Sequence, residues 1–328
     1  MAEQRQVDRN MTVILAANER YAAPLCVTLF SALKNISVPD GGEIIFRVFD
    51  SGIRSESKRR IEASLASLGK QHALLWHSVD RDMLRNLPTV ESHPQETFLR
   101  LMLHQIVPDG TKRVVWLDCD TVVSGDLRDL FLVDLKGMAI AAVPDYGGPK
   151  VSWSAGTSTT FAALGISSEC PYFNAGVMVI DLALWAHQSI PQKTLEYTSK
   201  YSRHLRYADQ DGLNIAAAGR WAALPLRWNV QVATLEALEA LIAGSEDYQL
   251  RDHWEKLKEQ RPSLLASPFL IHFITGKPWK SGWRSRPARV WFECLRESAF
   301  FTPMEFWVFH RQARWAVLMR AISRRLFG

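Results

Sequence analysis

The chain has 328 residues, 47% of them hydrophobic and 22% charged, which is typical of a folded globular protein and excludes a disordered one. Its formal net charge is +5, and the five arginines of residues 306–328, a segment without acidic residues, equal that excess. Because no recognisable RNA-binding module accompanies this basic end, a nucleic-acid partner is not expected. The four cysteines are scattered and lack metal-site or disulfide spacing. No apolar run reaches the roughly 18 residues of a membrane span, and no secretory signal is predicted. We therefore expect a cytoplasmic protein.

Strands and helices are expected to alternate along the first half of the chain. The apolar runs expected to form strands are 11–18, 43–50, 73–79, 114–117 and 138–145. The segments expected to form helices between them are 21–35, 55–69 and 95–107, and the second carries an apolar stripe at helical spacing. This alternation predicts an α/β fold with a mostly parallel sheet flanked by helices on both sides.

The second half is less regular. A long Gly-, Ser- and Thr-rich stretch runs to Pro171, and loops of this length are commonly functional or mobile. The segments that follow are a strand entering a helix at 172–185, a short helix at 208–219, a helical and solvent-facing region at 235–260, and a strand followed by a Gly-Pro-Lys loop at 270–283.

Two aspartates end the apolar run RVVWLDCDTVV at residues 113–123. Ligands of open α/β sheets bind at the carboxyl ends of strands, where Asp118 and Asp120 are expected. Residues two apart on an extended chain point the same way, so both carboxylates are expected to face one cation. Carboxylates suit magnesium or manganese, which would neutralise phosphate charge.

Five short motifs stand in a particular order along the chain. They are Ala16-Ala17-Asn18, Asp118-Cys119-Asp120, Asn174-Ala175-Gly176, Asp209-Gln210-Asp211, and His272 followed by Lys277-Pro278-Trp279. In this order they resemble the retaining nucleotide-sugar glycosyltransferases of family 8, which include glycogenin and the bacterial lipopolysaccharide α-galactosyl- and α-glucosyltransferases. The resemblance covers about residues 12–283 and implies one Rossmann-like catalytic domain of the type called GT-A, which we place at 1–284.

The resemblance also implies a set of site residues. Asp118, Asp120 and His272 would ligate manganese, or magnesium in its place, and Lys277 would add a positive charge beside the donor diphosphate. Further positions that match nucleotide- or phosphate-binding residues are Ala16, Asn18, Tyr21, Arg100 and Cys119. Positions that match residues around the donor sugar and the reaction centre are Asp145, Asn174, Asp209, Gln210 and Asp211. Asn18 stands where the family often has aspartate, and Arg20 also departs from the common pattern.

The reaction implied is transfer of galactose or glucose from a UDP-sugar to a hydroxyl of a glycan acceptor, with retention at the anomeric carbon. Gln210 occupies the position of a nucleophile beneath the sugar, and an amide is a poor nucleophile. We therefore favour front-face attack by the acceptor hydroxyl over double displacement. Relatives act on lipid-linked acceptors, so a lipopolysaccharide or related glycolipid is the expected acceptor, reached at the cytoplasmic face of the cell membrane.

Residues 285–328 are expected to form a helical, membrane-associating tail. On a helical wheel one face is apolar, and Arg320 and Arg324 lie on the opposite face. The residues of the apolar face are Trp315, Leu318, Met319, Ile322 and Leu326. A helix at an anionic membrane surface and a helix docked on the domain both fit this pattern, and we favour the membrane, helped by Trp307 and Phe309.

Other interpretations remain open at this point. The run Asp118-Cys119-Asp120-Thr121 also fits a haloacid-dehalogenase-type phosphatase, with Asp118 as nucleophile and Asp120 as general acid. That motif normally opens its domain, whereas here two strand–helix units precede it. A nucleotidyltransferase would share the metal and the nucleotide but not the Asp209-Gln210-Asp211 and His272–Trp279 elements. The full set of metal ligands argues against a non-catalytic sugar-nucleotide or membrane-binding protein. Asn174 fits a turn as well as a sugar contact, and Asp209 fits a helix cap equally well.

Overall fold

A computed structural model describes residues 10–38, 42–85, 87–89, 94–153, 158–281 and 285–313. Its main sheet has seven strands in the order β3-β2-β1-β4-β7-β6-β8. The strands are β1 (Asn10–Ala17), β2 (Glu43–Asp50), β3 (His72–Ser78), β4 (Arg113–Leu117), β6 (Ile140–Pro144), β7 (Phe173–Asp181) and β8 (Ala222–Ala223). All pairings are parallel except those of β7, which runs antiparallel to β4 and β6. The predicted α/β fold with a mostly parallel sheet is confirmed.

A second, smaller sheet continues from the end of β4. It contains β5 (Thr121–Val123), β10 (Leu270–His272) and β9 (Val230–Gln231) in the order β5-β10-β9. β10 runs antiparallel to β5, with His272 opposite Thr121, and parallel to β9, with His272 opposite Gln231. This register brings a histidine from the last third of the chain beside the residue that follows Asp120.

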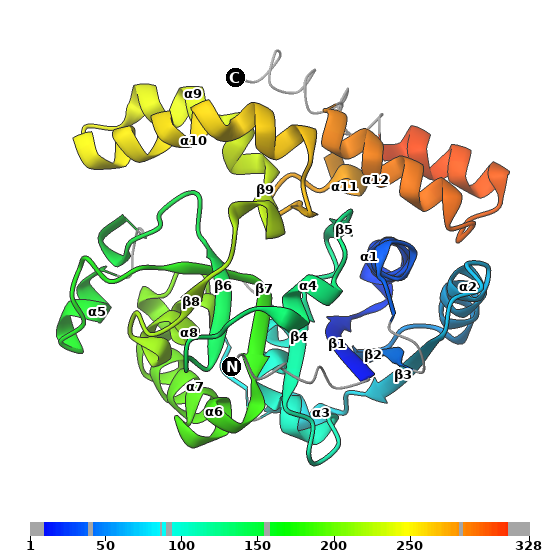
Figure 1. The fold of residues 1–328 in the computed structure, drawn as a ribbon, viewed down its shortest axis with the longest axis horizontal. Coiled ribbons are helices and arrows are strands. Elements are labelled where there is room, and N and C mark those ends of the chain that lie inside the picture. The colour runs from blue at the N-terminus through cyan, green and yellow to red at the C-terminus, as the bar shows by residue number, and fades with distance from the viewer. Residues whose placement is uncertain are drawn as a thin grey trace, which may run out of the picture.

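Both faces of the main sheet are buried, because alternate residues of its strands enter two different cores. In β4, Val115 and Leu117 belong to one core, and Val114 and Trp116 belong to the other. The helices contributing to the first core are α1 (Ala22–Asn35), α2 (Ser55–Ala66), α9 (Val232–Gly244), α10 (Tyr248–Ala266) and α12 (Arg286–Glu297). Those of the second are η2 (Gln95–Gln105), α6 (Leu182–His187), α7 (Ile190–Tyr201) and α8 (Asp209–Ala217). Figure 1 shows α9, α10 and α12 on the side away from α6–α8.

Short elements complete the described chain. They are η1 (Glu19–Tyr21), α3 (Arg81–Arg85), α4 (Arg128–Leu132), η3 (Val151–Trp153), α5 (Ser158–Ala163), η4 (Ser202–His204), η5 (Leu226–Trp228) and α11 (Pro278–Ser281). The stretch expected to be irregular up to Pro171 therefore contains η3 and α5, and Lys150 pairs with Pro171 in an isolated bridge.

Two predicted helical regions differ from the expectation in detail. Residues 95–107 are helical as predicted, but the helix is the 3₁₀ helix η2, which ends at Gln105 and has a non-helical Met102. Four consecutive residues, 98–101, are buried there, so tertiary packing rather than one amphipathic face sets the conformation. Residues 235–260 are helical as predicted, but they do not face solvent throughout. Asp247 caps the start of α10 after a break, and both α9 and α10 bury apolar side chains in the first core.

The start of the expected C-terminal tail is built into the first core. Trp291 and Leu295 of α12 are fully buried, and the Cys294 thiol lies 3.7 Å from the Val27 carbonyl oxygen of α1. Residues 303–313 form a further helix, in which Ala313 is buried. The predicted amphipathic face from Trp315 to Leu326 lies outside the described residues.

Candidate functional site

Asp118 and Asp120 lie in a bend that carries the chain from β4 in the main sheet to β5 in the small sheet. The chain is not extended there, so the alternation argument for their shared direction was wrong. The bend is held instead by neighbours: the Thr28 hydroxyl lies 2.9 Å from the Cys119 carbonyl oxygen, and the Cys119 thiol donates to the Ala16 carbonyl at 2.9 Å. Burial and the two flanking carboxylates raise the pKa of that thiol well above its usual value, so it stays protonated as a donor.

His272 joins the two aspartates. Its Nε2 lies 3.2 Å from Asp120 Oδ1 and 3.9 Å from Asp118 Oδ2. One candidate ligand atom from each of the three residues lies within 4.8 Å of the others. The structure therefore brings together all three side chains that the sequence assigned to a metal, and two carboxylates with an imidazole form a donor set that fits manganese or magnesium.

Each oxygen of Asp118 has a separate environment. Oδ1 accepts from Arg100 Nη2 at 3.0 Å and from Trp116 Nε1 at 2.9 Å. Oδ2 is the oxygen that faces His272. Arg100 and Trp116 thus hold the carboxylate by Oδ1 and leave Oδ2 directed toward His272.

Arg100 is a buried cation that links two motifs. Besides Asp118, it contacts Asp209 Oδ2 through Nε at 2.8 Å, and its Nη1 donates to the Ala175 carbonyl at 2.6 Å. Burial alone would lower the pKa of Arg100, but the neighbouring carboxylates outweigh it and raise the pKa. Burial raises the pKa of Asp209 to about 6, against the opposing effect of Arg100. Asp209 is therefore a partner of Arg100 as well as the first residue of α8.

Lys277 lies against Asp120. Its ammonium group contacts Asp120 Oδ2 and donates to the carbonyl oxygens of Phe273 at 2.6 Å and Ile274 at 3.1 Å. Burial by itself would raise the pKa of Asp120, but the neighbouring Lys277 ammonium group outweighs burial and lowers it well below its ordinary value. Asp120 is thus held as a carboxylate, and the predicted contact of Lys277 with a diphosphate stays a prediction.

The residues expected around the donor sugar also converge. Asp145 Oδ2 accepts from Asn174 Nδ2 at 3.2 Å and from Gln210 Nε2 at 3.3 Å. Gln210 Oε1 in turn accepts from the Ala175 backbone N–H at 3.0 Å. The Gln210 amide oxygen is therefore turned toward the backbone, and its nitrogen faces Asp145.

Asp211, by contrast, is enclosed. Its Oδ2 accepts from the backbone N–H groups of Arg206 and Tyr207 at 2.8 and 2.7 Å, and its Oδ1 accepts from the Tyr172 hydroxyl. The side chain is fully buried, and burial raises its pKa. These contacts order the turn that leads into α8, where Ala208 takes a left-handed φ of 47°. Such strain is sustained only by the surrounding structure.

Of the expected nucleotide-binding residues, Ala16 lies near the end of β1, and Asn18 and Tyr21 follow that strand. The Asn18 side chain accepts from the Arg20 N–H at 3.1 Å and caps η1, so its oxygen is engaged within the chain. Tyr21 meets Trp279 edge-on, with ring centroids 5.9 Å apart. Burial and the charges of Asp120 and Asp118 raise the pKa of Tyr21. Because β1 pairs with β4, these residues lie beside the Asp118–Asp120 bend, and their ligand contacts stay predictions.

Sequence reasoning missed two features beside His272: the buried Asn229 and the close approach of Gly176. Asn229 is fully buried and contacts both Asn174 and His272. A methyl group built on Gly176 would lie 2.2 Å from His272 Cε1. The only available signal was a polar residue inside the apolar run Trp228–Val230, together with a glycine inside a strand.

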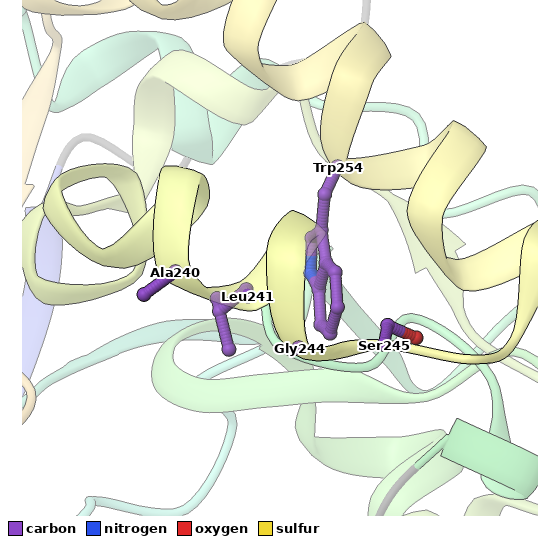
Figure 2. Close-up of a pocket in the computed structure, with 5 residues that line it drawn as sticks. All are labelled: Ala240, Leu241, Gly244, Ser245 and Trp254. Carbon is purple, nitrogen blue, oxygen red and sulfur yellow. The ribbon is translucent and has the colours of Figure 1, made fainter.

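A surface hollow between α9 and α10 is separate from this cluster (Figure 2). Its lining residues are Ala240, Leu241, Gly244, Ser245 and Trp254. None of them belongs to the group formed by Asp118, Asp120 and His272 or to that formed by Asp145, Asn174 and Gln210. The link is indirect: Trp254 Nε1 donates to the carbonyl oxygen of Tyr146, the residue after Asp145, at 3.2 Å.

Comparison with known proteins gives the family. The sequence model described as glycosyl transferase family 8 matches residues 12–282, most of the chain. The chain belongs to glycosyltransferase family 8. The alternative of a haloacid-dehalogenase-type phosphatase, based on the same Asp118-Cys119-Asp120 run, receives no support.

Individual relatives agree with this family. General stress protein A of Bacillus subtilis is 27% identical over 280 residues, covering 84% of this chain and 89% of that protein. Lipopolysaccharide 1,3-galactosyltransferase of Salmonella typhimurium is 28% identical over 254 residues, covering 76% of this chain and 67% of that protein. The crystal structure of galactosyltransferase LgtC with donor and acceptor sugar analogs superposes with a TM-score of 0.69 at 25% identity, covering 91% of this chain and all of that one. In the part of the chain that the structure describes, no helix is both long and apolar enough to cross a bilayer.

Proposed function

We propose that this chain is a metal-dependent, retaining hexosyltransferase that moves galactose or glucose from a UDP-sugar to a hydroxyl of a glycan acceptor. The observation that carries the proposal is the convergence of Asp118, Asp120 and His272 beside Arg100 and Lys277. A glycosyltransferase must stabilise the charge of its departing nucleoside diphosphate, and carboxylates alone would repel it. A divalent cation bound by the three ligands, with manganese or magnesium the expected ion, supplies positive charge at that place.

A second cluster, formed by Asp145, Asn174 and Gln210, supports recognition of the donor sugar. Asn174 and Gln210 both donate to Asp145 and both accept from the Ala175–Gly176 backbone. Their amide groups and the Asp145 carboxylate have the donors and acceptors that sugar hydroxyls pair with. Arg100 joins this cluster to the proposed metal ligands, because it donates to the Ala175 carbonyl oxygen at 2.6 Å and pairs with Asp118. A donor whose diphosphate lies at the metal ligands would thus extend its hexose toward Asp145.

The contacts of Gln210, Asp209 and Asp211 support front-face attack over double displacement. The oxygen of Gln210 accepts a backbone N–H, Asp209 pairs with Arg100, and both oxygens of Asp211 are engaged. A covalent intermediate would require one of these groups to leave its partners. We propose instead that the acceptor hydroxyl attacks from the side of the departing UDP and gives its proton to a diphosphate oxygen.

The proposed acceptor is a lipopolysaccharide or related lipid-linked saccharide, in line with the named activity of the Salmonella relative. The proposed location is the cytoplasmic face of the cell membrane. The described part of the chain offers a contact surface on the helix of residues 303–313. Met304, Trp307 and Val308 are 71%, 53% and 41% exposed, and Arg311 lies over the Trp307 ring at 4.5 Å. An apolar face with a flanking cation suits the interface of an anionic bilayer.

Replacing Met304 and Trp307 together by glutamine should weaken binding to vesicles containing phosphatidylglycerol by about tenfold or more, because two apolar side chains lose their burial in lipid. Co-sedimentation with such vesicles measures the effect. The matched control is Tyr248→Gln, which removes an aromatic side chain that is 81% exposed on α10. Equal vesicle binding by the double variant and the wild type would contradict a membrane role for this face.

A panel of UDP-sugars tests the enzymatic proposal. Without acceptor, the protein should release UDP slowly by hydrolysis from UDP-galactose or UDP-glucose in the presence of Mn²⁺ and should lose this activity in EDTA. p-Nitrophenyl phosphate in parallel reports phosphatase activity. Phosphate release from that substrate, with every UDP-sugar intact, would overturn the proposed function.

A further inference from the structure

A chain of buried hydrogen bonds connects Asp145, in the proposed sugar-binding cluster, to His272. Asn174 Nδ2 donates to Asp145 Oδ2 at 3.2 Å, and Asn229 Nδ2 donates to Asn174 Oδ1 at 2.9 Å. His272 Nδ1 lies 2.9 Å from Asn229 Oδ1. The exposed fractions of Asn174, Asn229 and His272 are 6%, 0% and 3%, so water does not compete for these contacts.

The direction of every bond in this chain follows from one fixed donor. The backbone N–H of Gly176 points at the Asn174 side chain at 3.1 Å, so the atom it meets is an acceptor, Oδ1. That oxygen also faces Asn229, whose nearer atom is consequently its amide nitrogen. The remaining amide atom of Asn229 is its oxygen, and it faces His272 Nδ1. At the other end, the Asp145 carboxylate independently requires the Asn174 nitrogen as donor.

We propose that Asn229 is a positioning residue that holds the proton of His272 on Nδ1. The imidazole then presents the lone pair of Nε2, the atom 3.2 Å from Asp120 Oδ1, to a divalent cation. Metal-binding histidines depend on such partners for ring orientation and basicity. The same oxygen of Asn174 receives both Gly176 and Asn229, so the backbone of β7 sets the protonation pattern of a ligand on β10.

This inference rests on the proposed metal role of His272, and its test reads metal binding directly. Asn229→Leu keeps the approximate volume and removes the acceptor, so Mn²⁺ affinity, measured by electron paramagnetic resonance without any donor, should fall about 10- to 100-fold. The matched control is Asn214→Leu. Asn214 is also buried and also hydrogen-bonds β7, through the Phe173 backbone, but it does not touch His272. Its Mn²⁺ affinity should match that of the wild type.

A second measurement needs no variant at position 229. Long-range ¹H–¹⁵N spectra of the wild-type protein at pH 8 with Mg²⁺, in which His272 is assigned by comparison with His272→Asn, should place the imidazole proton on Nδ1. A proton on Nε2, or unchanged Mn²⁺ affinity in Asn229→Leu, would overturn the inference. If the wild type binds no Mn²⁺, the proposed metal site fails instead, and the spectra still decide the tautomer.

Discussion

Gly176→Ala should lose Mn²⁺ binding and sugar transfer together, because the added methyl group would overlap the side chain of His272, a proposed metal ligand. The new Cβ would lie 2.2 Å from His272 Cε1, 2.8 Å from its Nδ1 and 3.1 Å from Asn174 Oδ1. Carbon atoms that are not bonded to each other do not approach to 2.2 Å, so the imidazole must move by about 1 Å or more. A displacement of that size exceeds the tolerance of a preorganised site. We expect Mn²⁺ affinity to fall by at least about 100-fold, with transfer reduced to a similar degree.

The variant should also be less stable by about 1–3 kcal/mol, as expected for overpacking at a buried position. Thermal unfolding therefore accompanies the metal titration. The matched control is Gly244→Ala at the end of α9, where the added methyl group meets no heavy atom within 4 Å apart from its chain neighbours and the backbone of its own helix. Wild-type Mn²⁺ affinity in Gly176→Ala would show that His272 either does not bind the metal or moves without penalty.

Asp120→Asn should reduce UDP release from the preferred donor by about 10³-fold at saturating Mn²⁺, with the fold intact. The amide keeps the shape of the carboxylate but removes the charge that faces both His272 and Lys277. Lys277 retains the carbonyl oxygens of Phe273 and Ile274 as partners. The initial rate of UDP release measures the effect, and circular dichroism checks the fold.

Asp181→Asn is the matched control for that change. Asp181 lies opposite Arg113, at the other end of β4, and caps α6 by accepting from the Leu184 N–H. Asparagine caps helices about as well as aspartate, so activity and stability should both be preserved. Near-wild-type UDP release by Asp120→Asn would remove Asp120 from the metal ligands.

The fold class was predictable because the sheet is buried on both faces. β1, β4 and β7 are almost wholly apolar, and such runs stand out in a sequence. The reversed direction of β7 was not predictable, because an apolar run has the same appearance whichever way its strand runs. The small sheet was missed because β9 has two residues and β5 and β10 have three, too few for any periodicity.

In the candidate site, too, residues in local motifs were predictable from the sequence, whereas contacts between distant segments were not. Asp118, Asp120 and His272 were found because their motifs are local and ordered along the chain. The proposed role of Asn229 depends on an oxygen of Asn174, 55 positions away, and on the pairing of β9 with β10. Neither leaves a pattern in the sequence. The bend at 118–120 likewise follows from the change of sheet between β4 and β5.

The most direct test of the metal site is a Mn²⁺ titration followed by electron paramagnetic resonance on the wild type, Asp120→Asn and Asp181→Asn. We predict one bound ion per chain in the wild type and in Asp181→Asn, with affinity lowered by about 100-fold or more in Asp120→Asn. Absence of bound Mn²⁺ in the wild type, or equal affinity in Asp120→Asn, would contradict a catalytic metal held by Asp118, Asp120 and His272.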